Sequence, residues 1–575
     1  MNATGLPPAG PGSRSIRAEP GNPIPLLTLQ KAGFRYRDAD AAALRDIDLV
    51  IRPGEGIAVL GPQGSGTSTL ARLAAGLLSD RGEHSGTVNR NARAALLGDD
   101  PEAQLTGLSR SAAEEVSLPA RLTGMLRDSL PGAVGQAMSA LSIAHLAGRD
   151  VSTLSGGERQ LTALAGLLVL APPLVILDQP GLALDARARA HLLRALDAHR
   201  QAGGAVLLTG HQHDELSAAC DHVLLLDRGR LTGTGNVTAQ PALLSRYGVW
   251  DTRPAAGPVP GSAHSAPQDA PFRAGSSSCV HDTSRLPGVQ APGRDGGEEG
   301  TGQDLLLRVR GLRVRRGGRT VIDGVDLDLL AGTTTALLGA NGSGKSTLLA
   351  ALAGLLGPAD RPADRPADRP GTSPEDIPAS GRRRTGGLTR GRRRGKRPVD
   401  DVAGSIIDRA GTELGALPLH ARARHLAWVG QDPGMQLSAA SARAELEGAV
   451  PLARHRRTER TRLRARRHEQ VDGIMERLDL QHDAATHPYD LSPARRKDLV
   501  IASALLLEPA ALLLDEPTLG RDLAGMQRLN TLLNDFTGAG GTVLVATHDL
   551  HWASSIADRT VHLCPPEDTT PSHAP

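Results

Sequence analysis

The chain has 575 residues, enough for two to four domains, and its 65 Lys and Arg nearly balance its 62 Asp and Glu. This balance argues against a protein whose overall charge recruits nucleic acid or an acidic partner. Aromatic residues make up only 2% of the chain, so its cores must be built from Leu, Val, Ile and Ala, which suits α/β layers. Cys220, Cys279 and Cys564 are far apart and lack metal-ligand or redox spacing, which fits a reducing cytoplasm.

The N-terminal residues 1–25 are rich in Pro, Gly and Ser and have no apolar core, so we expect a disordered tail without a signal peptide. The longest apolar stretch, Leu161 to Leu177, is broken by Pro172 and Pro173. We expect it to form a helix followed by a buried strand, because a membrane span needs a longer unbroken run. If the protein works at a membrane, another chain must supply the spanning part.

The two halves of the chain repeat the same motifs. Three pairs of motifs are each separated by 337 positions: residues 154–158 and 491–495, Asp178 and Asp515, and His211 and His548. The glycine-rich loops that begin at Gly61 and Gly339 are only 278 positions apart, so the second copy carries an insertion after its first helix. This insertion, at about 358–402, contains a tandem Pro-Ala-Asp-Arg repeat and a basic run, and its composition predicts a disordered surface loop.

The repeat predicts two domains, 26–247 and 304–564. A flexible linker rich in Pro, Gly and Ser is expected over 248–303, and a polar tail over 565–575. In each domain short apolar β-type runs alternate with longer helical patterns. This alternation predicts an α/β fold with a mostly parallel central sheet.

A phosphate-binding loop is predicted in the second domain, between the apolar run 335–338 and the helix-forming run 348–352. Its glycines let backbone N–H groups close around phosphate oxygens. Lys345 supplies a positive charge to the β- and γ-phosphates, and Ser346 offers a hydroxyl to Mg²⁺. The loop reads Gly339, Ala340, Asn341, Gly342, Ser343, Gly344, Lys345, Ser346 and Thr347.

Two further motifs accompany this loop: the apolar run 512–514 that ends in Asp515 and Glu516, and the Leu-Ser-Gly-Gly motif at 154–157. With these motifs, both halves of the chain resemble nucleotide-binding domains of the ATP-binding cassette superfamily. The resemblance implies two P-loop NTPase domains, each with a helical subdomain, that use ATP and Mg²⁺. It also implies head-to-tail pairing of the domains, within the chain or between chains. Each ATP would then lie between the phosphate loop of one domain and the Leu-Ser-Gly-Gly signature of the other.

The resemblance also assigns roles in the second half. Asp515 is expected to hold Mg²⁺ through water, and Glu516 to orient or deprotonate the attacking water. Gln431 matches the loop that reaches the metal and the transmembrane partner, and His548 matches the residue that contacts the γ-phosphate. The expected catalytic residues are therefore Lys345, Gln431, Glu516 and His548, and the expected metal-binding residues are Ser346, Gln431 and Asp515.

The first half lacks several of these groups. Thr67 stands where the lysine is expected, Gln179 replaces the glutamate, and Asp99 occupies the place of Gln431. A neutral hydroxyl does not offset phosphate charge, and the change from carboxylate to amide alone is expected to lower the rate roughly 10²–10⁴-fold. The degenerate nucleotide site is expected to use Gly61, Gly64, Ser65, Gly66, Thr67, Ser68, Thr69, Asp178, Gln179, His211 and Ser492.

The signature motifs show the reverse pattern, because the first half has the intact motif and the second half has the altered one. The first half keeps the signature residues Ser155, Gly156, Gly157 and Glu158, among which the small Ser and Gly residues let backbone N–H groups approach a γ-phosphate. In the second half Ser492 is followed by Pro493, which removes a backbone donor, and by Ala494, which adds a Cβ. Head-to-tail pairing therefore predicts one hydrolytic site and one site that at best binds nucleotide.

One base contact is suggested in the first half. Tyr36 fits the family's aromatic residue that stacks on adenine, and the alternative is an ordinary core position on a strand. The second half has Arg316 at this place, and its guanidinium plane is a candidate substitute.

The residues after the position of Gln431 suggest a branch of the superfamily. Residues 100–105 and 432–437 resemble the Asp-Pro-Glu-x-Gln-Leu pattern of energy-coupling factor transporter ATPases, although Gly434 lacks the carboxylate. That resemblance implies a groove for an arginine-bearing coupling helix beside Pro101, Glu102, Gln104, Pro433 and Gln436. It also implies work at the cytoplasmic face of the membrane, where a separate transmembrane scaffold and a substrate-binding membrane subunit import a vitamin or a transition-metal ion.

Two alternatives remain, the ATPase of an exporter and a soluble tandem-cassette ATPase that acts on ribosomes. The ribosomal proteins resemble each other in a charged, helical interdomain linker and usually two competent sites, and this chain has neither. The basic run Arg382 to Arg397 is compatible with contact to RNA or anionic lipid. A solvated loop is the favoured interpretation of that run, so no nucleic-acid partner is expected.

Overall fold

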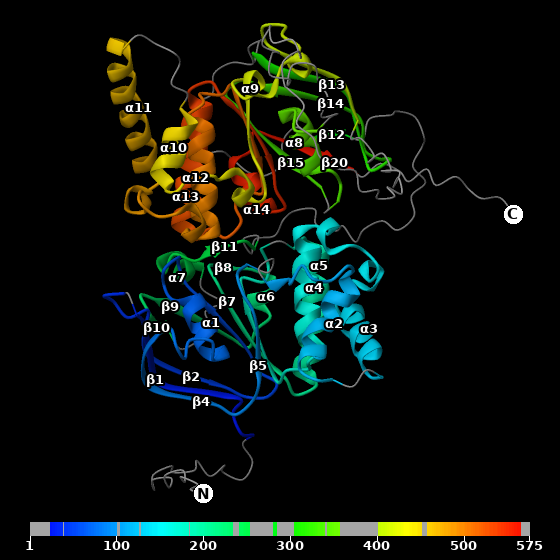
Figure 1. Cartoon of the computed structure of the whole chain (residues 1–575), viewed down its shortest axis with the longest axis vertical. Helices are drawn as coiled ribbons and strands as arrows, with labels where there is room; N and C mark the ends of the chain where they lie inside the picture. The colour runs from blue at the N-terminus through cyan, green and yellow to red at the C-terminus, as the bar shows by residue number, and fades with distance from the viewer. Residues whose placement is uncertain are drawn as a thin grey trace, which may run out of the picture. The chain divides into compact units, whose positions relative to one another are not determined.

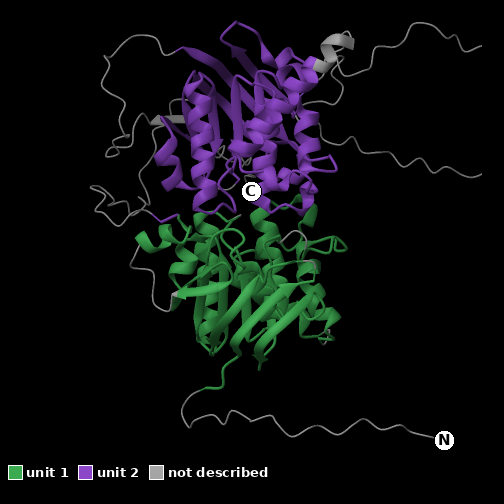
Figure 2. Ribbon diagram, turned by 90° about the vertical axis from the view of Figure 1, so that its left-hand side faces the viewer, with its two compact units in different colours: residues 1–251 green, residues 252–575 purple. Residues whose placement is uncertain are grey.

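The computed structural model (Figure 1) describes residues 23–37, 39–100, 104–125, 128–182, 184–233, 241–253, 280–283, 304–339, 342–356, 401–450 and 457–564. Most of the predicted N-terminal tail and insertion, and the whole predicted C-terminal tail, lie outside these residues. The chain divides into two compact units, Met1–Asp251 (unit 1) and Thr252–Pro575 (unit 2), which Figure 2 distinguishes by colour.

Unit 1 contains a six-stranded sheet in the order β10-β9-β3-β7-β6-β5, which is parallel except for β10, and an antiparallel sheet in the order β2-β1-β4. The strands are β1 (Leu27–Tyr36), β2 (Leu44–Ile51), β3 (Gly56–Leu60), β4 (Gly82–Arg90), β5 (Ala94–Leu97), β6 (Leu174–Asp178), β7 (Ala205–Gly210), β8 (Gln212–His213), β9 (His222–Asp227), β10 (Arg230–Gly233) and β11 (Trp250–Asp251). The helices are α1 (Thr67–Ala75), α2 (Ala112–Leu122), α3 (Leu130–Ala140), α4 (Gly156–Leu168), α5 (Ala186–Gln201), α6 (Glu215–Ala218) and α7 (Pro241–Arg246).

The central strands of unit 1 are buried on both faces, as their unbroken apolar sequence requires. Every residue of β3, β6 and β7 is buried. Along β6, Val175 and Leu177 pack into one hydrophobic core, whereas Leu174 and Ile176 pack into a second core on the opposite face. Helices α2, α3 and α4 pack against one another as a helical subdomain.

Unit 2 repeats this plan, with sheets in the orders β12-β20-β15-β19-β18-β17 and β14-β13-β16. Its strands are β12 (Val280–Thr283), β13 (Leu305–Arg316), β14 (Arg319–Leu330), β15 (Thr334–Leu338), β16 (Asp401–Asp408), β17 (Leu426–Val429), β18 (Ala511–Asp515), β19 (Thr542–Ala546) and β20 (Arg559–Leu563). Its helices are α8 (Lys345–Ala353), α9 (Leu419–Arg422), α10 (Ala442–Ala449), α11 (Arg457–Arg477), α12 (Pro493–Leu505), α13 (Leu523–Gly538) and α14 (Leu550–Ile556). The predicted α/β class with mostly parallel central sheets is confirmed.

The structure departs from the predicted linker at two short strands. Strand β11 pairs in parallel with β8, and β12 pairs antiparallel with β20. Strand β12 adds to the edge of the central sheet, whereas β11 forms a separate two-stranded sheet with β8. Both pair through backbone N–H and C=O groups, which requires no apolar alternation in the sequence. Strand β16 likewise begins at Asp401, inside the predicted insertion. Within the part of the chain that the structure describes, no helix combines the length and the apolar character of a membrane span.

The packing of α14 onto α13 generates a prediction about stability. Trp552 is fully buried, and its indole N–H donates to the side-chain oxygen of Asn530 at 2.7 Å. Trp552→Ala should therefore destabilise unit 2 by about 3–5 kcal/mol, because it leaves a cavity and an unpaired amide. Urea unfolding followed by circular dichroism measures this change. Leu550→Ala on the exposed side of the same helix is the control, and equal midpoints for the two variants would contradict the assignment.

Candidate functional site

The phosphate-binding loop of unit 2 joins β15 to α8. Gly344 adopts a left-handed φ of 98° immediately before the helix, and no side chain caps the first turn, so its backbone N–H groups remain available to an anion. Lys345 is buried and its ammonium group donates to the carbonyl of Gly339 at 2.6 Å. Ala340 and Asn341 lie outside the described residues. The loop is thus built as a cradle of N–H groups with one cation inside it.

Three parallel strands bring the other predicted groups of unit 2 to the same edge of the sheet. Strands β15, β19 and β18 are neighbours, and Asp515 at the end of β18 lies opposite Ala546 on β19. Glu516 follows with a left-handed φ of 48°, and its side chain turns to His548, whose Nδ1 lies 2.9 Å from a carboxylate oxygen. The backbone N–H of His548 donates to the same oxygen at 3.3 Å.

The two carboxylates have different electrostatic environments. Burial acts to raise the pKa of Glu516, but the charge and hydrogen bonds of His548 and the charge of Lys345 outweigh it, so the pKa lies below its ordinary value. Burial raises the pKa of Asp515, against a hydrogen bond from Ser346 and the charges of two lysines. Glu516 is therefore held as an anion next to a histidine, as a proton acceptor requires.

The donor set around Asp515 fits Mg²⁺. One carboxylate oxygen of Asp515 is buried and has no hydrogen-bond partner among the described residues, while Ser346 hydrogen-bonds to the carboxylate. A carboxylate and a hydroxyl are the hard oxygen ligands that this ion prefers. Gln431, the third predicted ligand, is exposed in the loop after β17. A bound Mg²⁺ would neutralise phosphate charge beside these two side chains.

Unit 1 has the same backbone arrangement with different side chains. Gly66 adopts a φ of 104° before α1, but the first residue of that helix is the buried Thr67. Gln179 makes the same left-handed bend as Glu516, with a φ of 55°. His211 does not face it, because its Nδ1 lies 2.8 Å from the carbonyl of Gly61. Asp178 accepts a hydrogen bond from the hydroxyl of Thr209 at 2.7 Å. The contact between the residue at the bend and the histidine is thus made in unit 2 but not in unit 1.

The two signature segments both begin helices. Ser155 caps α4 in a reciprocal pair, because its hydroxyl accepts from the N–H of Glu158 and its own N–H donates to the Glu158 carboxylate at 2.8 Å. Ser492 caps α12 by accepting from the N–H of Arg495 at 3.4 Å, without the reciprocal bond. Pro493 occupies the first helical position, where proline fits without breaking the helix. The helix is therefore kept in unit 2 while one backbone donor is lost.

The predicted partner-coupling residues have structural contacts of their own. Gln104 donates to the carbonyl of Leu96 at 3.0 Å, and Gln436 donates to that of Trp428 at 3.0 Å. Both amides thus fix the loop that follows a sheet strand. Pro433 begins a single turn of 3₁₀ helix over Pro433–Gln436, whereas Pro101 and Glu102 lie outside the described residues.

The contacts of Tyr36 are internal to unit 1. Its hydroxyl lies 3.2 Å from that of Thr69 in the first turn of α1, and its ring packs edge-on against Phe34. Stacking of Tyr36 on adenine stays a prediction.

Three buried charged residues of unit 2 are not predicted by the sequence motifs. Lys497 and Asp498 lie in the second turn of α12, and Arg521 lies between β18 and α13. The repeat offset contained the signal, since the residues 337 positions earlier are Gln160, Leu161 and Leu184. Two positions that are apolar in unit 1 thus carry an acidic and a basic residue in unit 2.

Two units with the same sheet order and the same loop positions make this chain a tandem P-loop ATPase that binds ATP. The chain belongs to the ABC transporter family, whose model matches residues 44–181, 322–366 and 397–519. The matched residues make up more than half of the chain and fall in both units.

Relatives of similar organisation are known by name. A protein of Bifidobacterium longum, named as an ABC transporter ATP-binding protein, is 29% identical over 560 residues, covering 93% of this chain and 64% of that protein. The chain therefore spans just under two thirds of that relative. A Bacillus subtilis protein, named as an HMP/thiamine import ATP-binding protein, is 25% identical over 567 residues, covering 94% of this chain and 90% of that protein.

Solved structures share the fold. A model of ribosome-bound archaeal Pelota and ABCE1 matches 92% of this chain and 76% of its own chain, with a TM-score of 0.57 and 15% identity. At this identity the likeness shows the fold alone.

The contact between His548 and Glu516 predicts a change in pH dependence. His548→Gln removes the charge that lowers the pKa of Glu516 and leaves the burial that raises it, so the acidic limb of the kcat profile should move to higher pH. The value of kcat should also fall, by roughly 10²-fold. ATPase rates measured across the acidic range test this. His562→Gln, on the exposed side of β20, is the control, and an unmoved limb in His548→Gln would refute the pairing.

Proposed function

We propose that this chain is the ATP-hydrolysing, energy-coupling subunit of a membrane transporter, with one hydrolytic and one degenerate nucleotide site. The observation that carries the proposal is the asymmetry of the two strand ends. Glu516 is buried, ionised and paired with His548 beside Lys345, whereas Gln179 carries no charge and His211 faces the phosphate loop instead. Water attack on a γ-phosphate needs a group that orients the water and accepts its proton, and Glu516 is that group.

Head-to-tail pairing combines the complementary halves. The intact phosphate loop of unit 2 would receive the intact signature that begins at Ser155, whose cap leaves the first backbone N–H groups of α4 directed at an anion. The loop at Thr67 would receive the segment that begins at Ser492. This pairing, within one chain or between two, gives one site with the complete set of groups.

A groove in unit 2 fits a membrane partner. It has a volume of about 420 Å³ and lies between strand β17 and helices α9 and α12. Its lining is mainly apolar, including Trp428, Val500 and Leu507, and it contains no carboxylate. An apolar helix of a transmembrane scaffold suits this lining better than the arginine-bearing helix expected from sequence.

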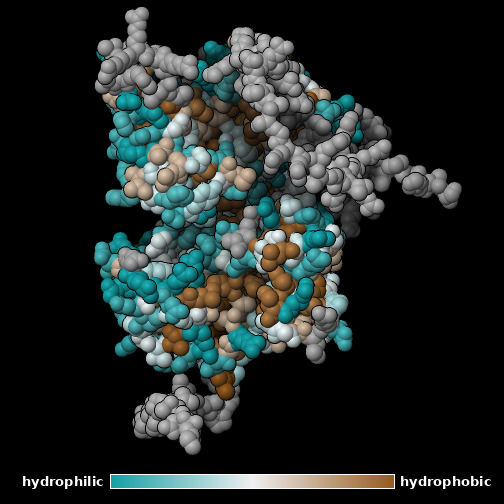
Figure 3. Space-filling model, viewed as in Figure 1, coloured by the Kyte–Doolittle hydropathy of each residue, from teal (hydrophilic) through white to brown (hydrophobic). Residues whose placement is uncertain are grey.

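Hydrophobic side chains also gather on the face of unit 1 seen in Figure 3, as on surfaces that contact other proteins.

The proposed direction is import, and the proposed cargo is a vitamin or a transition-metal ion. The name of the Bacillus subtilis relative, an HMP/thiamine import ATP-binding protein, supports a vitamin-like cargo. A substrate-binding membrane subunit would select that cargo, and the chain would act at the cytoplasmic face of the membrane. Ribosome binding is the alternative outcome of the partner test below.

Hydrolysis should depend on one carboxylate. Glu516→Gln should lower steady-state ATPase activity roughly 10²–10⁴-fold while ATP still binds, because the amide cannot accept a proton. Gln179→Glu should restore little activity to that variant, because Thr67 leaves the phosphate charge of its site without a lysine. Glu469→Gln, on the exposed side of α11, is the control. Substantial activity in Glu516→Gln would sink the one-site model.

The groove should be required for the membrane partner. Tagged chain from gently solubilised cells should recover a multi-span membrane protein, and Ser503→Arg, which places a long cation in the groove, should lose it. The purified Ser503→Arg variant should keep its ATPase rate, since Ser503 lines the groove and no residue assigned to the nucleotide site does so. Recovery of ribosomes without a membrane protein would replace the transport proposal.

A further inference from the structure

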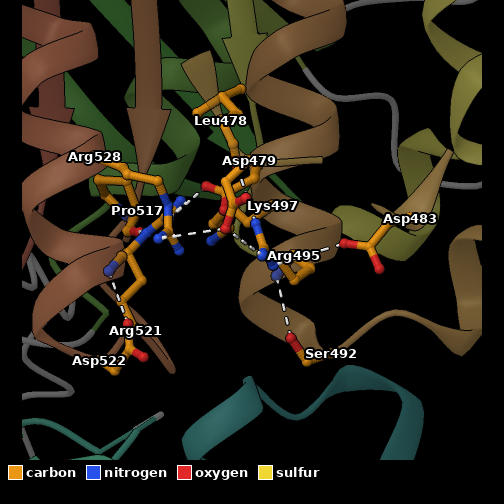
Figure 4. Close-up of polar contacts among 12 residues, drawn as sticks. Leu478, Asp479, Asp483, Ser492, Arg495, Lys497, Pro517, Arg521, Asp522 and Arg528 are labelled. Carbon is orange, nitrogen blue, oxygen red and sulfur yellow. Dashed lines mark hydrogen bonds and ion pairs between the residues drawn. The ribbon is translucent and has the colours of Figure 1, made fainter. Parts of the chain in front are cut away.

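We propose that Lys497, Asp498 and Arg521 are positioning residues that clamp the loop carrying Glu516 to helix α12. The inference rests on the proposed role of Glu516 as the proton acceptor. None of the three is expected to touch ATP. Their contacts instead fix the backbone from which the Glu516 side chain projects. Lys497, Pro517 and Arg521 are among the residues drawn in Figure 4.

Lys497 forms the first arm of the clamp. Its side chain is buried inside unit 2, with 2% of the residue exposed, and its ammonium group donates to the carbonyls of Asp515 at 3.0 Å and Glu516 at 2.9 Å. Burial lowers the pKa of Lys497 to about 8, although the nearby carboxylates oppose this shift. Removing an ammonium group from water costs free energy. Its two hydrogen bonds to consecutive carbonyls offset part of that cost and hold both carbonyls in place.

Arg521 and Asp498 form the second arm. The guanidinium of Arg521 pairs with the carboxylate of Asp498 on α12, and both residues are almost completely buried. The same guanidinium donates through Nε to the carbonyl of Pro517 at 2.7 Å. Three consecutive carbonyls, at positions 515, 516 and 517, are therefore bonded to two cations, one on α12 and one paired with α12.

The loop contains a bend that benefits from such support. Glu516 has a left-handed φ of 48°, a conformation that disfavours residues with a Cβ and persists only where its surroundings impose it. The backbone N–H of Glu516 is held by the carbonyl of Ala546 at 2.8 Å. The clamp fixes the opposite side of the same peptide units, so the carboxylate is restrained in its direction toward His548.

Unit 1 has the same bend without the charged residues of the clamp. Gln179 makes the same bend with a φ of 55°, yet Gln160 bonds only the carbonyl of Pro180, at 2.8 Å. The positions of Asp498 and Arg521 are filled there by Leu161 and Leu184, both buried. Because the fold makes this bend with apolar neighbours, the charges are not required for the bend itself. They occur in the unit that carries the glutamate.

Two variants test the clamp without creating an unpaired buried charge. Lys497→Gln installs the residue of unit 1, and the double variant Asp498→Leu with Arg521→Leu installs its apolar pair. Both should retain the thermal midpoint and the KM for ATP, since the phosphate loop is untouched, while kcat falls about 10- to 100-fold through a misplaced carboxylate. Thr531→Ala, on the exposed side of α13, serves as the control.

The outcomes separate the clamp from the function on which it rests. If Glu516→Gln is inactive but both clamp variants keep wild-type kcat, the clamp is refuted and the proposed function stands. If Glu516→Gln remains active, the premise itself fails. A double variant with a lowered midpoint and a full kcat would assign the ion pair to stability alone. Arg521→Leu by itself should unfold, because it leaves Asp498 buried and unpaired.

Discussion

The contact between His548 and Glu516 depends on the register of two buried strands. Strands β18 and β19 run in parallel with Asp515 opposite Ala546, so the residues after each strand leave the sheet at the same edge. The left-handed bend at Glu516 then turns its side chain toward the histidine instead of along the strand. In this buried position the charge and hydrogen bonds of His548, together with the charge of Lys345, outweigh the cost of desolvating the carboxylate. The chemistry of the site therefore follows from the way in which the sheet ends.

The same backbone serves both units, and the difference between them is chemical. In unit 1 the N–H of Gln179 is held by the carbonyl of Thr209 at 2.7 Å, just as the N–H of Glu516 is held in unit 2. An amide gives His211 no anion to pair with, and the histidine bonds the carbonyl of Gly61 instead. A nucleotide at unit 1 would thus meet helix dipoles and backbone donors, but no buried base and no lysine. This difference is the basis of the proposal that the site of unit 1 at best binds nucleotide.

Much of this arrangement was predictable from the sequence because it depends on local patterns. The strand, glycine loop and helix around Lys345, and the apolar strand that ends at Asp515, are contiguous segments whose residue types define their shape. The edge strands β11 and β12 were not predictable, because backbone pairing alone forms them. The buried charges escaped for another reason. By themselves Lys497 and Asp498 look like a solvated helix face. The apolar Leu161 and Leu184 at the matching positions of the first half were the sequence signal of burial, and the structure adds the pairing of Asp498 with Arg521.

The buried ion pair bears on why the two units diverged. Replacing such a pair with well-packed apolar residues is often neutral or stabilising, because desolvating two charges offsets most of their attraction. Unit 1 carries that apolar solution at Leu161 and Leu184, so the fold accepts it. The presence of Asp498 and Arg521 in unit 2 is therefore poorly explained by stability. A directional bond to the backbone beside Glu516 is something that a leucine pair cannot supply, and the proposed positioning of Glu516 would explain the difference.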